Sequence, residues 1–312
     1  MPQGIGAGGI MGLAFETTAG TYVAPTVFFP IRSESLVYKQ SSVFRRAIRG
    51  VVDPLGAVAG PSEFSGDIEM ECMEDAAIYF AYASRAAITK SGTSNYTYTV
   101  KGAHGGAQVT PKTLSITVVR NGITYGYTNC VVSSQEYSID NGLLIVKYSI
   151  LGSEEASQTL PTATYGSTVP YGAGQYSVEI PTGTAVTDSD NLTLTIDDAG
   201  ENQYRLRSTG RGPSFAKFGD RTTTLKLDRD FIDRTDYDAF KALTAQTITF
   251  TASKGTNNSI SFLIPVAIKD TYEVSLSGTG DLIRASIQYQ GMYDATTTAG
   301  YQITIKNQVN IT

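Results

Sequence analysis

The sequence predicts a mainly β protein, with two tandem β-sandwich or half-barrel domains that each carry one short α-helix. Residues 135–152 and 272–291 both indicate hairpins, because apolar and polar residues alternate on either side of a turn. A helix-like segment and a strand precede each hairpin in the same order. The closing glycines, Gly152 and Gly291, are too far apart for a short-unit solenoid, so the pattern indicates a duplicated domain.

The composition fits this fold class and narrows the function. The 312 residues are enough for two domains of about 150 residues each. The 31 Gly and 19 Tyr favour β structure with many turns. A net charge of −5 is poorly suited to gripping nucleic-acid phosphates over the whole surface, although a nucleic acid could pass without being held. No apolar run reaches the ~18–20 residues of a membrane helix, and no export signal is visible.

The chain lacks a catalytic or cofactor-binding pattern. Its one histidine, His104, lies in a Gly-rich stretch without a Cys or Asp at metal-ligand or triad spacing. Three early glycines match dinucleotide-binding spacing, but no strand precedes them. Cys72 and Cys130 fall in strand patterns and are expected to be buried thiols. We therefore expect no enzyme activity, no cofactor and no metal site.

Composition also sets the expected boundaries. Residues 1–30 are expected to form an N-terminal arm and residues 31–152 the first β domain. Small and polar residues dominate 153–175, which predicts an extended linker. The second β domain follows at 176–295. Residues 296–312 are expected to be a C-terminal strand or arm, because alternation resumes from Tyr301 to Ile311, and this strand could pair within the fold or with a neighbour.

Residues 41–62 lack strict alternation and are predicted to be a long loop. Basic and apolar residues mix in this stretch, which suits docking on a partner, although a solvated mobile loop is the alternative. The second domain has a similar basic stretch at 204–221. The candidate contact residues of the two stretches are Phe44, Arg45, Arg46, Ile48 and Arg49, and Arg205, Arg207, Arg211, Phe215, Lys217 and Phe218.

A strand predicted at 67–72 places Asp67, Glu69 and Glu71 on one face and apolar residues on the other. Three carboxylates in a row repel one another, so this face must be wet or paired. Paired carboxylates can also act as general acid and base, but no apolar cleft that would separate their pKa values is indicated.

Two helices are predicted. Residues 74–88 show an apolar stripe with acidic residues in the first turn. The second helix begins at Thr235, with Asp238 three residues later as a weak capping box. Further strands are expected at 96–100 and 114–118, with a loop around His104. The second helix is expected to turn three apolar residues toward a sheet, namely Ala239, Phe240 and Leu243.

The first half of the chain carries short motifs in a fixed order. This order resembles the tail tube proteins, or major tail proteins, of long-tailed phages of the siphophage type. The resemblance is strongest over residues 10–90 and returns at the hairpin from Tyr137 to Gly152. Its motifs are a Gly-rich start, Phe15–Thr18, Gly20–Tyr22, Phe28–Pro30, Arg32–Leu36, a basic stretch ending at Arg49-Gly50, and Phe64–Glu69.

The resemblance implies a structural virion protein that polymerises into stacked rings, forming the tail tube through which the genome is delivered. Members with one tube domain form six-fold rings, so two domains per chain imply trimeric rings with pseudo-six-fold symmetry. The two basic stretches would contact neighbouring rings. Asp67, Glu69 and Glu71 would line the channel, where negative charge repels DNA phosphates.

The implied partners are further copies of the chain, the tape measure protein and passing DNA in the lumen, and tail terminator and distal tail proteins at the tube ends. The implied location is the virion tail, assembled in the host cytoplasm. The alternative reading is a virion-surface decoration protein or adhesin that binds a glycan or receptor through its loops.

Overall fold

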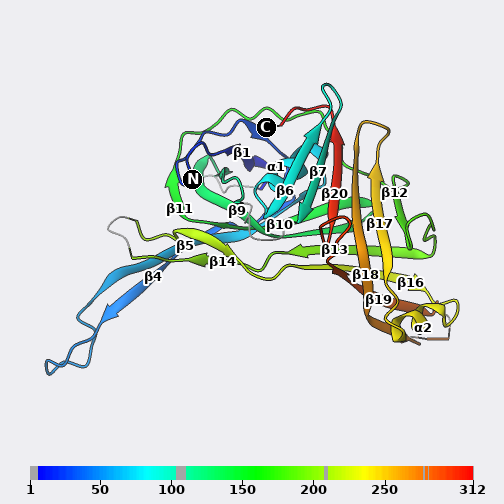
Figure 1. Cartoon of the computed structure of the whole chain (residues 1–312). Coiled ribbons are helices and arrows are strands. Elements are labelled where there is room, and N and C mark those ends of the chain that lie inside the picture. Colours follow the sequence, from blue (N-terminus) through cyan, green and yellow to red (C-terminus); the bar gives the residue numbers. More distant parts are fainter. Residues whose placement is uncertain (1–5, 103–109, 207–209, 277, 280, 312) are drawn as a thin grey trace.

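The structure is a computed structural model that describes residues 6–102, 110–206, 210–276, 278–279 and 281–311. It confirms the mainly β class (Figure 1). The described residues contain two α-helices, α1 (Glu74–Tyr82) and α2 (Thr235–Lys241), and a 3-10 turn at Gly6–Gly8. The strands are β1 (Ile10–Phe15), β2 (Val27–Phe28), β3 (Ser33–Glu34), β4 (Val37–Arg45), β5 (Gly56–Glu71), β6 (Ala86–Ser91), β7 (Tyr96–Gly102), β8 (Leu114–Arg120), β9 (Ile123–Asp140), β10 (Leu143–Gly152), β11 (Glu154–Ser157), β12 (Tyr176–Glu179), β13 (Ser189–Asp197), β14 (Gly200–Gln203), β15 (Phe215–Phe218), β16 (Thr222–Asp230), β17 (Gln246–Ser253), β18 (Ser259–Ser275), β19 (Arg284–Met292) and β20 (Gln302–Asn307).

One long antiparallel sheet runs along the base of the molecule in Figure 1. Its order is β4-β5-β10-β9-β13-β16-β19-β18, and we call it the base sheet. The contact between β9 and β13 joins strands from the two halves of the chain. The arm made by β4 and β5 lies at one end of the base sheet, and α2 lies beside the other end.

A second layer covers one face of the base sheet. Over the first half it consists of β2, β1, β8, the first part of β9 and β11. Over the second half it consists of β12, β17, the first part of β18, β20, β7 and β6. The long strands β9 and β18 therefore pass from one layer into the other.

The core lies between the layers and is continuous across the two halves. Phe64 stacks on Tyr127 at 4.1 Å between ring centroids, and Phe80 stacks on Tyr148 at 4.0 Å. Tyr137 of the first half meets Phe262 of the second half at 4.5 Å. Burying such rings removes large apolar areas from water, which makes these contacts a main source of stability.

The hairpin predicted at 135–152 is confirmed. Asn141 and Gly142 have φ values of 49° and 76°, which the tight turn between β9 and β10 requires. The second hairpin is formed by β18 and β19, with Tyr272 opposite Ile287. Part of its turn lies outside the described residues.

The strand pairings follow the same order in both halves. In the first half β4 pairs with β5, β5 with β10 and β10 with β9. In the second half β13 pairs with β16, β16 with β19 and β19 with β18. The second layer repeats its order too. In the first half β1 pairs with β8, β8 with β9 and β9 with β11. In the second half β12 pairs with β17, β17 with β18 and β18 with β20.

The helix predictions need two corrections. Helix α1 ends at Tyr82, not at residue 88, because Ser84 donates its hydroxyl back to the carbonyl of Ala81 and β6 begins at Ala86. Helix α2 starts at Thr235 as predicted, but its cap is different. The N-cap residue is Arg234, which makes no side-chain cap hydrogen bond, so Thr235 and Asp238 do not form a capping box. The Asp233 carboxylate instead accepts a hydrogen bond from the Thr235 N–H at 2.8 Å.

Other predictions change at the level of single elements. Leu243 points away from the sheet and is 63% exposed, whereas Phe240 stacks on Tyr272. Residues 10–15 of the expected arm form β1, and residues 154–157 of the expected linker form β11. The C-terminal strand β20 pairs within the fold, between β18 and β7. The strands predicted near 96–100 and 114–118 are present as β7 and β8. The loop predicted around His104 lies outside the described residues.

Candidate assembly surfaces

The outward face of the base sheet is polar and mainly acidic. On β5 the side chains alternate as predicted, with Ile68, Met70 and Cys72 fully buried and the three carboxylates on the opposite face. The register places the following charged residues on this outward face: Glu63, Asp67, Glu69, Glu71, Glu136, Asp140, Asp197, Asp228, Asp230 and Glu273, with Lys39, Lys147, Lys226 and Arg284. Acidic residues therefore outnumber basic ones on this face.

The acidic row on β5 is partly paired. Lys147 contacts Asp67 at 3.2 Å, and the hydrogen bond to this carboxylate raises the pKa of Lys147. Arg32 bridges Glu69 at 3.7 Å and Asp140 at 2.9 Å. Glu71 lies opposite Ile145 on β10. All of these charged groups are partly open to water, where screening makes each pair worth little for stability.

The stretch predicted as a loop at 41–62 is in fact a β-hairpin arm that projects from the body (Figure 1). Strands β4 and β5 pair from Val37, which lies opposite Ser65, to Arg45, which lies opposite Gly56, with a bulge after Gln40. Both faces of the arm beyond the body are exposed, which removes the pressure for apolar alternation. The prediction of a loop is therefore wrong for strands β4 and β5 and holds for the tip at 46–55.

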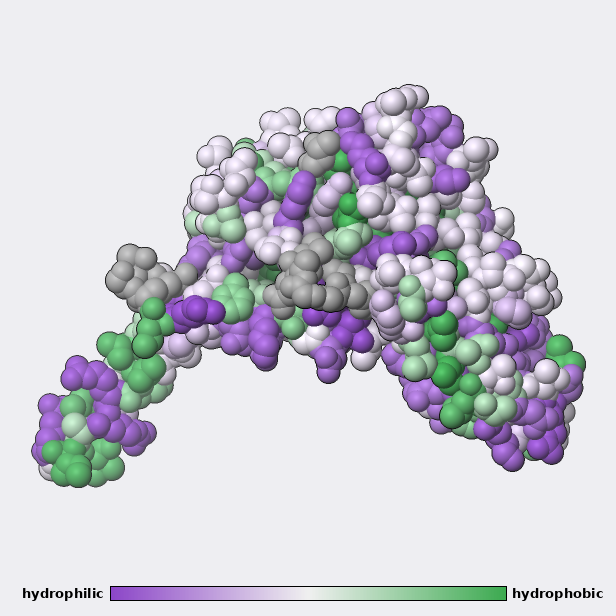
Figure 2. Space-filling view, in the orientation of Figure 1, coloured by the Kyte–Doolittle hydropathy of each residue, from purple (hydrophilic) through white to green (hydrophobic). Residues whose placement is uncertain are grey.

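The arm tip combines apolar and cationic side chains. Phe44 is 62% exposed and Ile48 is fully exposed, beside Arg45, Arg46 and Arg49. Figure 2 shows the apolar colour concentrated at this tip among hydrophilic residues. A monomer gains nothing from exposed branched and aromatic side chains, so such a patch is typical of a contact surface.

The basic stretch at 204–221 does not project in the same way. It packs beside the root of the arm, where the Tyr204 hydroxyl donates to the Ser62 carbonyl at 3.2 Å. The Ser62 N–H donates to the Arg211 carbonyl at 3.1 Å. Ser153 in turn donates to the carbonyl of Pro213. The two stretches that the sequence analysis treated separately therefore lie together at one end of the molecule.

The remaining candidate contact residues of this stretch lie mostly at the surface. The Arg205 guanidinium sits over the Phe215 ring at 5.0 Å, and Lys217 pairs with Glu201 at 3.4 Å with both side chains well exposed. Phe218 is half-buried, with the Arg85 guanidinium at 5.9 Å from its ring. Arg207 lies outside the described residues.

The opposite end of the base sheet carries a second apolar surface that the sequence analysis missed. Figure 2 shows this surface near α2 and the tip of β18 and β19. Apolar residues next to the turn at 278–281 were the available signal, because a hairpin tip in water is normally polar. The exposed residues are Ile232, Leu243, Val274, Leu276, Leu282 and Ile283.

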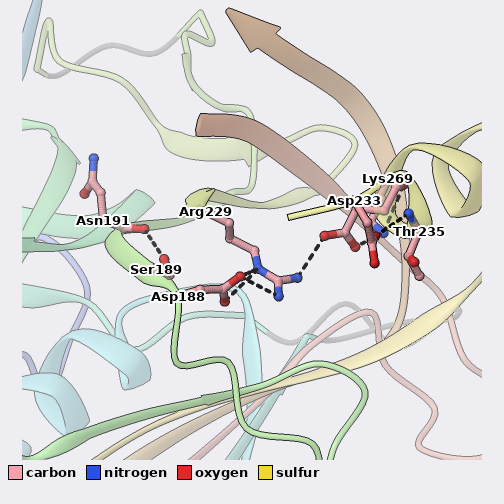
Figure 3. A network of polar contacts seen from close by, with 8 residues as sticks. Asp188, Ser189, Asn191, Arg229, Asp233, Thr235 and Lys269 are labelled. Atoms are coloured by element: carbon pink, nitrogen blue, oxygen red, sulfur yellow. Dashed lines mark hydrogen bonds and ion pairs between the residues drawn. The ribbon is translucent and has the colours of Figure 1, made fainter. Parts of the chain in front are cut away.

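A polar network fixes this end (Figure 3). Arg229 on β16 contacts Asp188 and Asp236 at 3.1 Å each. The buried Lys269 ammonium on β18 contacts the Asp236 carboxylate at 2.7 Å. Because Asp236 belongs to α2, these ion pairs hold the helix against both strands.

Metal-ligand clusters and reactive thiols were the two kinds of chemical site to look for among the described residues. They contain no group of three or more His, Cys, Asp or Glu side chains placed to hold a metal ion. Burial raises the pKa of both thiols, Cys72 and Cys130, which disfavours the reactive thiolate. Arg120 lines a cleft between β1, β3 and β8, but the Arg120 guanidinium donates two hydrogen bonds of 2.7 Å to the Glu34 carboxylate.

Comparison with known families decides the class of this protein. The family model described as phage tail tube protein matches residues 6–291, nearly the whole chain. The chain belongs to the phage tail tube protein family. A search of curated proteins finds no match.

Family membership gives the surfaces a context. A tail tube protein is a structural component of the virion tail that self-assembles into a tube, and it is not an enzyme. None of the helices in the described residues is long and apolar enough to span a membrane. The exposed apolar ends and the acidic outward face are therefore surfaces of an assembling protein.

Proposed function

We propose that this tail tube protein forms trimeric rings with pseudo-six-fold symmetry, and that the rings stack into the conduit for genome delivery. The observation that carries the proposal is the repeated pairing order of the two halves. Each chain then supplies two equivalent units, as expected from a duplicated domain, so three chains supply the six units of a ring. The domain boundaries near 31–152 and 176–295 belong to this proposal.

The base sheet supports ring closure. In the described residues its order begins with β4 and ends with β18, and these two edge strands lie at opposite ends of the molecule. An interface that joins one end of a subunit to the other end of its neighbour closes into a ring when the rotation allows it. Open sheet edges invite such pairing.

Barrel geometry gives three chains an open bore, which a single chain would not form. Strands about 4.8 Å apart and tilted by about 40° give a backbone diameter of roughly 48 Å for three base sheets joined edge to edge. One base sheet closed on itself would be only about 16 Å across, a size that side chains fill. Three chains therefore leave an open bore, and its wall would be one face of the base sheet.

We assign the outward face of the base sheet to the lumen. Asp67, Glu69 and Glu71 belong to a mainly acidic surface, and such a surface repels the phosphates of passing DNA. Two of the cations on this face are engaged by carboxylates, Lys147 by Asp67 and Arg284 by Asp190 and Asp230. DNA and a tape measure protein would occupy this lumen.

We assign inter-ring contacts to the arm and to the stretch beside its root. The candidate residues remain Phe44, Arg45, Arg46, Ile48 and Arg49 on the arm. On the adjacent stretch they are Arg205, Arg207, Arg211, Phe215, Lys217 and Phe218. Tail terminator and distal tail proteins would meet the same surfaces at the two tube ends.

Electron microscopy of the purified protein tests the proposal. Uniform hollow filaments or rings with three chains per ring are expected. Six chains per ring would refute the trimer and the barrel diameter derived for three base sheets. A monomer that never assembles, as expected of a decoration protein or adhesin, would refute the ring altogether.

A further inference from the structure

We propose that neighbouring copies of the chain pair edge to edge through β18 of one copy and β4 of the next, in the register that β9 and β13 use inside each chain. This inference rests on the proposed ring. It adds the two strands that meet and the residues that lie opposite one another.

The internal junction provides the pattern. Antiparallel pairing of β9 with β13 places Glu136 opposite Thr195 and Ser134 opposite Asp197. At this junction the last base-sheet strand of the first half meets the first base-sheet strand of the second half. A second junction of the same kind would join the second half of one copy to the first half of the next.

Strand β18 corresponds to β9. Ser149 of β10 lies opposite Ser134, and Gln288 of β19 lies opposite Thr271. Ser149 and Gln288 are each three residues before the closing glycine of their hairpin. Thr271 therefore corresponds to Ser134, and two residues later Glu273 corresponds to Glu136.

Strand β4 corresponds to β13. In the first half Val37 lies opposite Ser65, and two residues later Asp67 lies opposite Ser149. In the second half Thr195 lies opposite Thr224, and two residues later Lys226 lies opposite Gln288. Val37 therefore corresponds to Thr195, and by the same step Lys39 corresponds to Asp197.

The internal register then fixes the register between copies. Val37 of one copy lies opposite Glu273 of its neighbour, and Lys39 lies opposite Thr271. Between them Tyr38 faces Tyr272, which forms an aromatic cross-strand pair. Lys39 and Glu273 are diagonal neighbours of opposite charge.

Burial supports a missing strand beside β18. Tyr137 of β9 is 1% exposed, with Leu194 of β13 opposite and the Phe262 ring against it. Its counterpart on β18, Val274, is 39% exposed. Within the described residues no strand pairs with this part of β18 on the side away from β19. A copy of β4 at this edge would cover Val274 as β13 covers Tyr137.

The start of the β4 edge is already occupied. The Leu36 N–H donates to the Glu34 carboxylate at 3.0 Å, and the Leu36 carbonyl accepts from the Arg120 guanidinium at 2.7 Å. New backbone pairing therefore begins beyond Leu36, at Tyr38. The new ladder is short, so the isolated contact between two copies is weak and needs ring closure to persist.

Paired cysteines test the register. The Ser35 N–H donates to the Asp67 backbone carbonyl, so Ser35 and, two residues later, Val37 direct their backbone groups toward β5. Because the backbone groups of Val37 point away from the neighbouring copy, Val37 and Glu273 would form a non-hydrogen-bonded pair. Such pairs have Cα atoms about 4.5 Å apart, within reach of a disulfide. Diagonal partners are about 7–8 Å apart, beyond that reach. The native Cys72 and Cys130 are fully buried and do not compete.

The experiment compares four double variants in assembled tubes under oxidation. Val37→Cys with Glu273→Cys, and Lys39→Cys with Thr271→Cys, are expected to give covalent oligomers up to the closed ring. Lys39→Cys with Glu273→Cys is the offset control and is expected to cross-link at least about tenfold less. Thr195→Cys with Glu136→Cys is the internal control and should form a disulfide within one chain.

The outcomes separate this inference from the proposed ring. Tubes in which the offset pair cross-links best, or in which only the internal control reacts, overturn the register and leave the ring intact. Absence of rings from the unmodified protein overturns both. If one cysteine pair prevents assembly under reducing conditions, the second in-register pair decides the result.

Discussion

Replacing Phe262 by alanine should destabilise both halves of the chain together. Phe262 is buried, contacts Tyr137 of the first half at 4.5 Å and stacks on Phe250 at 5.5 Å. Removing a buried phenylalanine ring costs about 3–5 kcal/mol, because transfer energy is lost and a cavity remains. The loss falls on a core that both halves share.

The expected shift in melting temperature follows from the chain length. An unfolding entropy of about 2.1 cal/mol/K per residue gives the 312-residue chain roughly 0.65 kcal/mol/K. A loss of about 4 kcal/mol therefore lowers Tm by about 6 °C. Calorimetry of the unassembled protein should show this shift in one cooperative transition.

A partly exposed phenylalanine provides the control. Phe215→Ala removes a ring that is 40% exposed, so its Tm should stay within about 1 °C of the unmodified protein. If Phe262→Ala moves a second-half transition while a separate first-half transition stays in place, the shared core does not couple the halves and the reasoning is refuted.

Three further predictions concern the arm, the sheet face and α2. Ile48→Asp should shorten tubes in electron micrographs and leave Tm unchanged, since the Ile48 side chain is fully exposed in the monomer; unchanged tube length, or the same shortening by Leu160→Asp, would argue against the arm. Replacing Asp67, Glu69 and Glu71 together by lysine should slow DNA ejection without blocking assembly, and the amide versions should be intermediate; equal ejection rates would remove these residues from the lumen. The hydrogen bond from the Thr235 N–H lowers the pKa of Asp233, so this cap stabilises α2 above the unfolded pKa near 4 and is lost as the pH falls through the folded pKa. The Thr235 amide resonance should report that loss, and an Asp233→Asn variant should show a weaker pH dependence; identical titrations would contradict the cap.

Local patterns in the sequence predicted the elements that have one buried face. The Asn141-Gly142 turn and the alternation around Ile68 were predicted correctly, because turn chemistry and one-sided burial leave direct marks on the sequence. The same rule explains the error at 41–62, where both faces of the arm are in water and no alternation is imposed. In the sequence Ile88 continues the apolar stripe of the helix predicted at 74–88. In the structure it belongs to strand β6, where it pairs with Val100 on β7.

The assembly surfaces depended on contacts that are distant in the sequence. Nothing near Tyr204 indicates that its hydroxyl reaches Ser62, or that the second basic stretch folds against the root of the arm. The apolar residues beside the turn at 278–281 are a local signal, but Ile232 and Leu243, which flank α2, join that surface only when α2 is placed beside β18. Tertiary contacts, rather than local propensity, decide these features.

The two halves differ most in the length of their projections, since β4 and β5 extend far beyond the body while β14 and β15 are four-residue strands held close to it. In a trimeric ring, three long spokes would alternate with three short ones around the rim. Successive rings would then interlock identically only after turns of one third of a revolution, so the doubled chain would halve the number of equivalent ways in which one disc can seat on the next.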